Sequence, residues 1–226
     1  SSRPTTQLTM AAEAPVRYEI KYFDGDGNGQ LARYAMAMCN LPFTDTRFSG
    51  FPEFKALQDA GAFPMGQVPV LIDNETGKTL GDSWSIARYV CQISGLYPTD
   101  SFEAATAEMI VTYARFIKDS AGAAWFADDR AKAVEEWRTG KFATALGRIK
   151  AQYGDKTFYS GETAGYVDLC VYVALRSAMR TSDAITRESL AGDFGGLMDG
   201  FEALPGVKKY DDERKAIEAA KAAASE

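Results

Sequence analysis

Apolar and polar residues follow different periods in successive parts of this chain. Residues 16–23, VRYEIKYF, alternate and are rich in aromatic and β-branched side chains, which predicts a strand. Residues 30–40, QLARYAMAMCN, instead carry apolar side chains at helical spacing, and residues 43–48, FTDTRF, can form a second strand. The three segments together predict a β-α-β unit.

The same kind of pattern continues to residue 95. Residues 51–63 predict a loop or a short helix, and residues 67–73, QVPVLID, are strand-like. A turn at 74–77, NETG, leads to a short strand end at 78–82. A helix is expected over residues 83–95, because the segment begins with serine and stops at glycine. The predicted order is β-α-β-α-β-β-α.

Residues 96–101, LYPTDS, predict a domain boundary, because the pattern after this proline-containing segment is helical to the end of the chain. A long helix is expected over residues 102–126, and one or two more over 129–153. Residues 165–180, GYVDLCVYVALRSAMR, are the most apolar of these segments. We expect them to form the central helix of the second domain.

Composition narrows the classes of function. The chain of 226 residues is 46% apolar and 25% charged, as in soluble globular proteins, and no apolar run reaches the length of a membrane span. A net charge of −6 argues against a nucleic-acid partner. The lack of histidine excludes Ser-His-Asp and Cys-His catalysis. Cys39, Cys91 and Cys170 are far apart, which predicts reduced, buried thiols.

Residues 1–15, SSRPTTQLTMAAEAP, have a composition of their own. They are rich in Ser, Thr and Ala, have no acid before Glu13, and lack the apolar core of a secretory signal. This composition suits the remnant of an organelle transit peptide, and a disordered leader or a cloning remnant fits it equally well. The predicted location is therefore the cytoplasm or an organelle, with the plastid as the leading organelle.

The stretch DGDGNG, which begins at Asp24, matches half of a calcium loop. Asp24, Asp26 and Asn28 stand at positions 1, 3 and 5, and Gly29 stands at position 6. Position 12, which requires a bidentate glutamate, is Ala35, and the segment before the loop is a strand instead of a helix. We therefore expect a glycine-rich turn from strand to helix and no metal site.

Pro69 lies inside a strand-like segment. Proline removes a donor from a sheet, so it is expected at an edge or at a cis bond. A cis Val68–Pro69 bond would turn the backbone of Val68 outward, where its N–H and C=O groups can pair with an extended peptide ligand. An edge-strand proline without a ligand role is the alternative.

These features together resemble the glutathione transferases, and most of all the sigma-type members, which have a tyrosine at the end of the first strand. The resemblance rests on the strand ending in YF, the glycine-rich loop, GQVPVL and DSWSIARYV, and it covers about residues 17–215. It implies a thioredoxin-like, glutathione-binding domain over residues 16–95, a linker over 96–101, and an all-helical domain over 102–226. Residues 1–15 would be a leader outside both domains.

The resemblance implies a role for several residues in a glutathione site. Tyr22 would be catalytic, donating a hydrogen bond that holds the glutathione sulfur as a thiolate, the reactive form. Ser83, at a helix start, would bind the γ-glutamyl carboxylate, and Asp82 would take the ammonium group. Gln67 and Val68 would contact the peptide.

Three further binding residues follow from the resemblance. Phe51 and Lys55 match the family's WPxxK motif, which contacts the glycine end of glutathione, so Lys55 would meet the glycine carboxylate. Phe51 replaces the tryptophan and lacks its N–H donor. Glu108 lies where some members place an acid that reaches the ligand of the neighbouring subunit in a dimer. An ordinary solvated side chain is the alternative for Lys55 and for Glu108.

Other positions depart from the family pattern. Asn28 stands where the family has an arginine that supports the site beneath the thiol, and Asp24 and Asp26 add negative charge to the same loop. Both changes oppose the ionisation of a thiol. Gly165 replaces the hydroxyl residue that caps the central helix of the second domain, and Asp168 of the same motif is retained.

Two functions remain open at this point. The first is a homodimeric glutathione transferase that joins its co-substrate glutathione to a hydrophobic electrophile, with isomerase or peroxidase activity at the same site. Tyr113 and Phe116 are candidate residues for the electrophile pocket. The second is a weakly active or inactive structural subunit of a larger organellar complex, since a fold alone does not determine function.

Overall fold

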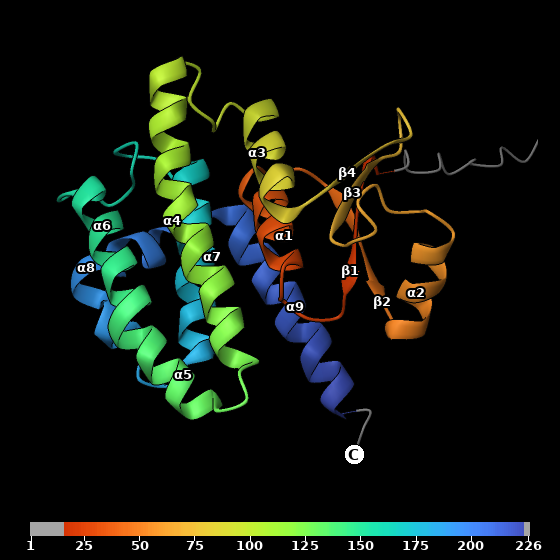
Figure 1. Cartoon of the computed structure of the whole chain (residues 1–226). Helices are drawn as coiled ribbons and strands as arrows, with labels where there is room; N and C mark the ends of the chain where they lie inside the picture. The colour runs from red at the N-terminus through yellow and green to blue at the C-terminus, as the bar shows by residue number, and fades with distance from the viewer. Residues whose placement is uncertain (1–15, 224–226) are drawn as a thin grey trace, which may run out of the picture.

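The computed structural model describes residues 16–223, so the predicted leader at residues 1–15 lies outside it (Figure 1). The first half contains a four-stranded sheet of order β2-β1-β3-β4. Its elements follow the predicted order, and their bounds are β1 (Tyr18–Phe23), α1 (Gly29–Met38), β2 (Phe43–Phe48), α2 (Phe51–Asp59), β3 (Val70–Asp73), β4 (Lys78–Gly81) and α3 (Ser83–Ile93). This is a thioredoxin-like βαβαββα arrangement.

The sheet register brings distant parts of the sequence to one end of the sheet. β1 runs parallel to β2 and antiparallel to β3, with Lys21 opposite Val70. β3 runs antiparallel to β4, with Val70 opposite Gly81. The residues just beyond these pairs, Tyr22 on β1 and Asp82 after β4, therefore lie at the same end of the sheet as Pro69.

The second half is helical. Its elements are α4 (Ser101–Trp125), α5 (Arg130–Glu136), a π-helical turn (Trp137–Phe142), α6 (Ala143–Tyr153), α7 (Tyr166–Thr181), α8 (Arg187–Glu202) and α9 (Pro205–Ala223). The segment 129–153 thus forms two helices joined by the π-helical turn. α4 begins within the expected linker, and the division into two domains at 96–101 stays a prediction. No helix within residues 16–223 combines the length and the apolar character needed to cross a bilayer.

Two helices hold the halves together. Every residue of α1 is buried, because the sheet and α3 cover it on one side and α7 and α9 on the other (Figure 1). α7 is the central helix, as predicted, with 12 of its 16 residues buried. All three cysteines have free thiols, of which Cys91 and Cys170 are buried as expected, whereas Cys39 at the end of α1 is half-buried.

Asp168 organises the start of α7. Its carboxylate accepts hydrogen bonds from the backbone N–H groups of Gly165 (2.9 Å) and Tyr159 (2.8 Å) and from the Tyr153 hydroxyl (2.8 Å). Gly165 adds no side-chain cap to the helix. Asp168 therefore compensates for the missing hydroxyl by joining α6, the loop after it and α7 through one buried carboxylate.

Candidate active site

Tyr22 lies at the end of β1, and the glycine-rich loop, residues 24–29, wraps around its ring. The hydroxyl oxygen accepts a hydrogen bond of 2.9 Å from the backbone N–H of Asn28. A Cβ atom at Gly27 would lie 2.4 Å from this oxygen, and a Cβ at Gly29 would lie 2.4 Å from the ring. Gly27 also has a positive φ of 35°. The glycines thus permit a contact with Tyr22 that no larger residue allows.

The two acids of the loop form ion pairs with residues in other parts of the chain. Asp26 pairs with Arg180 of α7, and Asp24 pairs with Arg47 of β2 at 3.1 Å and with Arg214 and Lys221 of α9. The bond from Lys221, followed by that from Arg47, lowers the pKa of Asp24. Within residues 16–223 no three or more His, Cys, Asp or Glu residues gather as metal ligands. The negative charge of the loop is therefore largely neutralised by these cations.

A buried arginine that sequence reasoning did not single out lies below Tyr22. The guanidinium of Arg33 is fully buried and 5.6 Å from the centre of the Tyr22 ring. It donates hydrogen bonds to the carbonyl oxygens of Gly25 (2.6 Å) and Phe23 (3.2 Å) and to the Asp45 carboxylate (2.9 Å). Arg33 thus holds the start of the glycine-rich loop and brings a cation close to the tyrosine. Its only sequence signal was a lone arginine in an otherwise apolar helix.

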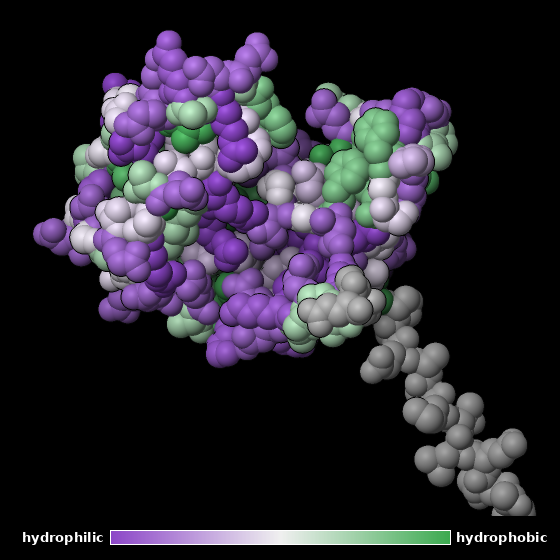
Figure 2. All heavy atoms as spheres, turned by 90° about the horizontal axis from the view of Figure 1, so that it is seen from below, coloured by the Kyte–Doolittle hydropathy of each residue, from purple (hydrophilic) through white to green (hydrophobic). Residues whose placement is uncertain are grey.

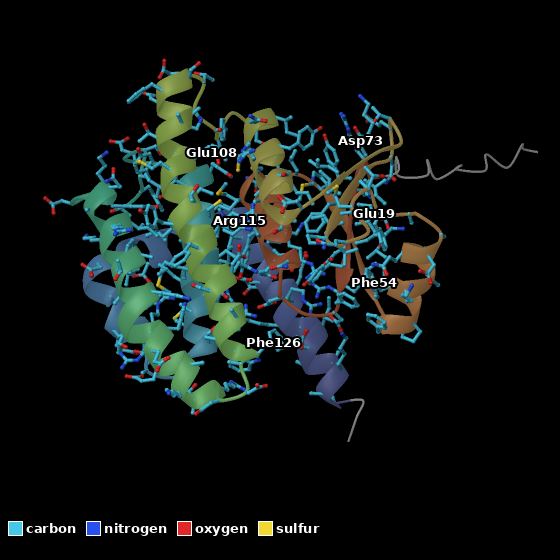
Figure 3. The ribbon with its side chains drawn as sticks, viewed as in Figure 1. Glu19, Phe54, Asp73, Glu108, Arg115 and Phe126 are labelled. Carbon is cyan, nitrogen blue, oxygen red and sulfur yellow. The ribbon has the colours of Figure 1, made fainter. Side chains whose placement is uncertain are left out.

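A cavity of about 750 Å³ opens beside Tyr22, between the glycine-rich loop and helices α4 and α7. Its lining combines apolar and charged residues, namely Tyr22, Gly27, Asn28, Lys118, Asp119, Gly122, Trp125, Phe126, Ser177, Arg180 and Thr181. Phe126, just after α4, is 86% exposed and labelled near the lower end of that helix in Figure 3. The cavity that Tyr22 lines therefore combines an aromatic wall with the charged side chains Lys118, Asp119 and Arg180.

The expected pocket residues Tyr113 and Phe116 do not line this cavity. Tyr113 lines a separate cavity with Met109 and accepts a hydrogen bond of 2.9 Å from Arg148. Phe116 is 43% exposed on α4. Neither residue lines the cavity, because the face of α4 towards it carries Lys118, Gly122 and Trp125.

The start of α3 carries features of an anion site. Ser83 is its first residue and is buried, and its hydroxyl has no hydrogen-bond partner among the described residues. Asp82 caps the helix by accepting bonds of 2.9 Å from the Ser85 N–H and hydroxyl. Asp82 has a φ of 66° and a ψ of 119°, a sparsely populated conformation that costs a non-glycine residue about 1–3 kcal/mol. Such strain is concentrated at functional sites.

The Val68–Pro69 bond is cis, and Pro69 comes just before β3, an inner strand of the sheet. The cis alternative was therefore right and the edge-strand alternative wrong. Val68 is half-buried, Gln67 is exposed, and both lie outside the pairing of the sheet. Because the register is antiparallel, Val68 lies near the start of α3 and the end of β1. Tyr22, Val68 and Ser83 are thus brought together.

The remaining candidates lie farther from the cavity. Phe51 is 65% exposed at the start of α2, and the ammonium of Lys55 pairs with Asp59 on the same helix. Figure 2, seen from below, shows apolar side chains over α2 and a hollow between this lobe and the helical half. The predicted roles of both residues stay predictions.

Glu108 is engaged within its own chain. It accepts bonds of 2.6 and 2.8 Å from the Arg88 guanidinium and one of 3.0 Å from the Tyr97 hydroxyl. In Figure 3, Glu108 and Arg115 follow one another down α4, and Phe126 lies just past its lower end. This arrangement ties α3 to α4 and keeps Glu108 away from the cavity beside Tyr22. Its predicted role in a neighbouring subunit's site stays a prediction.

Comparisons with known proteins agree with this architecture. A family model described as glutathione S-transferase, N-terminal domain, matches residues 27–98. The chain is 29% identical over 204 residues to hematopoietic prostaglandin D synthase of Gallus gallus, covering 87% of this chain and 96% of the relative. It is 26% identical over 210 residues to glutathione S-transferase 4 of Caenorhabditis elegans, covering 88% and 97%.

Solved structures show the same fold. The sigma class glutathione transferase of Fasciola hepatica superposes with a TM-score of 0.73 at 18% identity, covering 88% of this chain and 96% of that one. At this identity the likeness supports the fold alone, whereas the sequence matches span both halves of the chain. Residues 27–98 therefore match the glutathione S-transferase N-terminal domain, and most of the chain is similar to a prostaglandin D synthase and a glutathione S-transferase.

Proposed function

We propose that this chain is a glutathione transferase that holds the glutathione thiolate at Tyr22. The observation that supports this most is the hydrogen bond from the Asn28 N–H to the Tyr22 hydroxyl oxygen. Because the oxygen already accepts a bond, the O–H proton is free to be donated to a sulfur atom in the neighbouring cavity. Hydrogen bonds polarise one another, so the Asn28 N–H strengthens Tyr22 as a donor.

The rest of glutathione would extend from Tyr22 towards α3. The Val68 backbone would pair with the peptide, while the free Ser83 hydroxyl and the first N–H groups of α3 would bind the γ-glutamyl carboxylate. Asp82 would take the ammonium group, and Gln67 would contact the peptide. Lys55 and Phe51 would border the glycine end from α2.

The second substrate would occupy the 750 Å³ cavity, against Trp125 and Phe126. The glutathione thiol loses its proton to solvent, and the thiolate then forms a C–S bond to an electrophilic carbon. A leaving group departs with its electron pair, or a conjugated double bond takes it up. An isomerase reaction would use the same thiolate, and the chicken relative is named for prostaglandin D synthase.

Tyr22→Phe tests this assignment directly. A hydrogen bond to a charged group contributes about 1.5–3 kcal/mol, so kcat/KM with glutathione and a standard electrophile should fall about 10- to 100-fold. Glutathione binding, measured by calorimetry, should be retained. Tyr113→Phe is the matched control, because it removes a hydroxyl from the other cavity. Equal rates for Tyr22→Phe and the control would exclude the assignment.

We also propose that the protein forms a homodimer. Several large apolar side chains are exposed in both halves, including Phe51 (65%), Met65 (75%), Phe102 (82%) and Met109 (48%). A second copy of the chain would cover such surfaces. Light scattering should give twice the chain mass, and Phe51→Asp should lower it. A monomer at micromolar concentration would favour the structural-subunit alternative, in which another protein covers these residues.

A further inference from the structure

Lys118 connects the helical half to Tyr22. It extends from α4 into the cavity, where its ammonium donates a hydrogen bond to the side-chain oxygen of Asn28. The backbone N–H of the same asparagine donates to the Tyr22 hydroxyl. One residue of the glycine-rich loop thus has the catalytic tyrosine on one side and a lysine from α4 on the other.

Lys118 has no carboxylate partner within residues 16–223, because the acids near it pair with arginines. On its own helix, Asp119 lies 3.5 Å from Arg115. On α7, Arg180 pairs with Asp26 of the loop. The other charged or titratable groups that share a cavity lining with Lys118 are Tyr22 on β1, Tyr34 on α1 and Arg176 on α7. Arg33 of α1 lies beside the Tyr22 ring.

These surroundings make Lys118 a cation that an anion would stabilise. Burial lowers the pKa of its ammonium, and the Arg180 charge lowers it further, while Asp119 offsets part of this effect. The amide oxygen of Asn28 satisfies one donor but supplies no charge. A smaller cavity of about 80 Å³ shares Lys118 and Arg180 with the first one and has Arg176 in its own lining. The region next to the Tyr22 hydroxyl therefore has an excess of positive charge.

We propose that Lys118 supplies the positive charge that stabilises the glutathione thiolate on Tyr22, replacing from α4 the loop cation that Asn28 lacks. The inference rests on the proposed function. A cation close to a thiol favours its charged form, so the thiol releases its proton to solvent at a lower pH. The thiolate in turn favours the charged form of Lys118, so both groups are ionised together near neutral pH.

The test measures the ionisation of bound glutathione in variants at this position. The ultraviolet absorbance of the thiolate is titrated with pH in the enzyme–glutathione complex, and the pH profile of kcat/KM is recorded with a neutral electrophile. Lys118→Met should raise the thiolate pKa by about one unit, leaving about tenfold less thiolate at neutral pH. Lys118→Arg should keep the original pKa.

A second variant restores a positive charge on the glycine-rich loop. Asn28→Arg in the Lys118→Met background should bring the thiolate pKa back towards the starting value. If Lys118→Met acted only by disturbing the structure of the site, the new arginine would not restore the pKa. Lys209→Met is the matched control, because Lys209 is an exposed lysine of α9 that pairs with Glu213. It should leave the pKa unchanged.

Three results would overturn the inference. If wild-type protein bound no glutathione, the proposed function and the role of Lys118 would both fail. If it bound and ionised glutathione but Lys118→Met had the same thiolate pKa, only the role of Lys118 would fail. If Lys118→Met instead raised KM only for electrophiles that carry a carboxylate, with no change of pKa, Lys118 would be a contact for the second substrate.

Discussion

The backbone N–H of Asn28 and the hydroxyl oxygen of Tyr22 lie 2.9 Å apart, joined by a hydrogen bond that fixes the tyrosine at the mouth of a cavity. The residue that departs from the family pattern thus takes part in the site through its backbone, which any residue except proline can provide. Its side chain is left to receive Lys118. Asn28 thus contacts Tyr22 through its backbone and Lys118 through its side chain.

The glycine contacts predict a loss of activity without general unfolding. Gly27→Ala and Gly29→Ala would each bring a methyl group to within 2.4 Å of Tyr22, so the ring must move away from its hydrogen bond. We expect kcat/KM to fall at least tenfold in both variants. Gly25→Ala is the control, because a Cβ there meets no atom within 4 Å. Normal activity in Gly29→Ala would show that the ring position is unimportant.

Ser83→Ala should weaken glutathione binding with little effect on folding. Within residues 16–223 the hydroxyl has no hydrogen-bond partner, and alanine is a good helix former. Losing one hydrogen bond to a carboxylate costs about 1.5–3 kcal/mol, so the calorimetric Kd should rise about 10- to 100-fold. Ser85→Ala is the control, because it removes a hydroxyl of the same helix that is bonded to Asp82. It should change the Kd by no more than a factor of a few. An unchanged Kd in Ser83→Ala would remove Ser83 from the site.

Asp168→Ala should destabilise the helical half. The change leaves three donors without an acceptor, namely two backbone N–H groups and the buried Tyr153 hydroxyl. We expect the free energy of unfolding to fall by about 3–5 kcal/mol in urea denaturation. Asp183→Ala, at an exposed position, should change it by less than about 0.5 kcal/mol. Similar values for the two variants would contradict the role given to Asp168.

The Arg17–Asp73 pair predicts a specific dependence of stability on acid. The Arg17 guanidinium donates to both carboxylate oxygens of Asp73 and lowers the pKa of that carboxyl to about 2. Since the folded pKa is below the unfolded value of about 3.9, the pair stabilises the fold above pH 4 and loses its effect as pH falls towards 2. The Tm difference between wild type and Asp73→Asn should therefore be present at pH 6 and vanish near pH 2. A Tm difference that stays the same from pH 6 to pH 2 would contradict the role of the Arg17–Asp73 pair.

The sequence predicted the elements well where local patterns determine them. The βαβαββα order, the cis bond before Pro69 and the central position of α7 are confirmed. These depend on alternation, helical spacing and the chemistry of proline. The sequence did not decide between one helix and two over residues 129–153. The π-helical turn between α5 and α6 keeps the helical pattern of apolar residues, so no break is visible in the sequence.

The surroundings of the site could not be predicted in the same way. Asp24 was expected to oppose a thiolate, yet its partner Lys221 is 197 residues away in the sequence. Lys118 reaches Asn28 across the two halves. Contacts of this kind depend on how α4, α7 and α9 pack against the loop, which no local pattern encodes. For the same reason the sequence did not show that Tyr113 lines a different cavity from the one that Tyr22 lines.

The most direct test of the account is the ionisation of glutathione bound to the wild-type protein and to Tyr22→Phe, followed by thiolate absorbance as a function of pH. With Tyr22 present, the thiolate should form well below the free-thiol pKa of about 8.5, and Tyr22→Phe should raise the pKa of the bound thiol by about one to two units. Equal thiolate pKa values in the two proteins, with glutathione bound to both, would contradict the central claim.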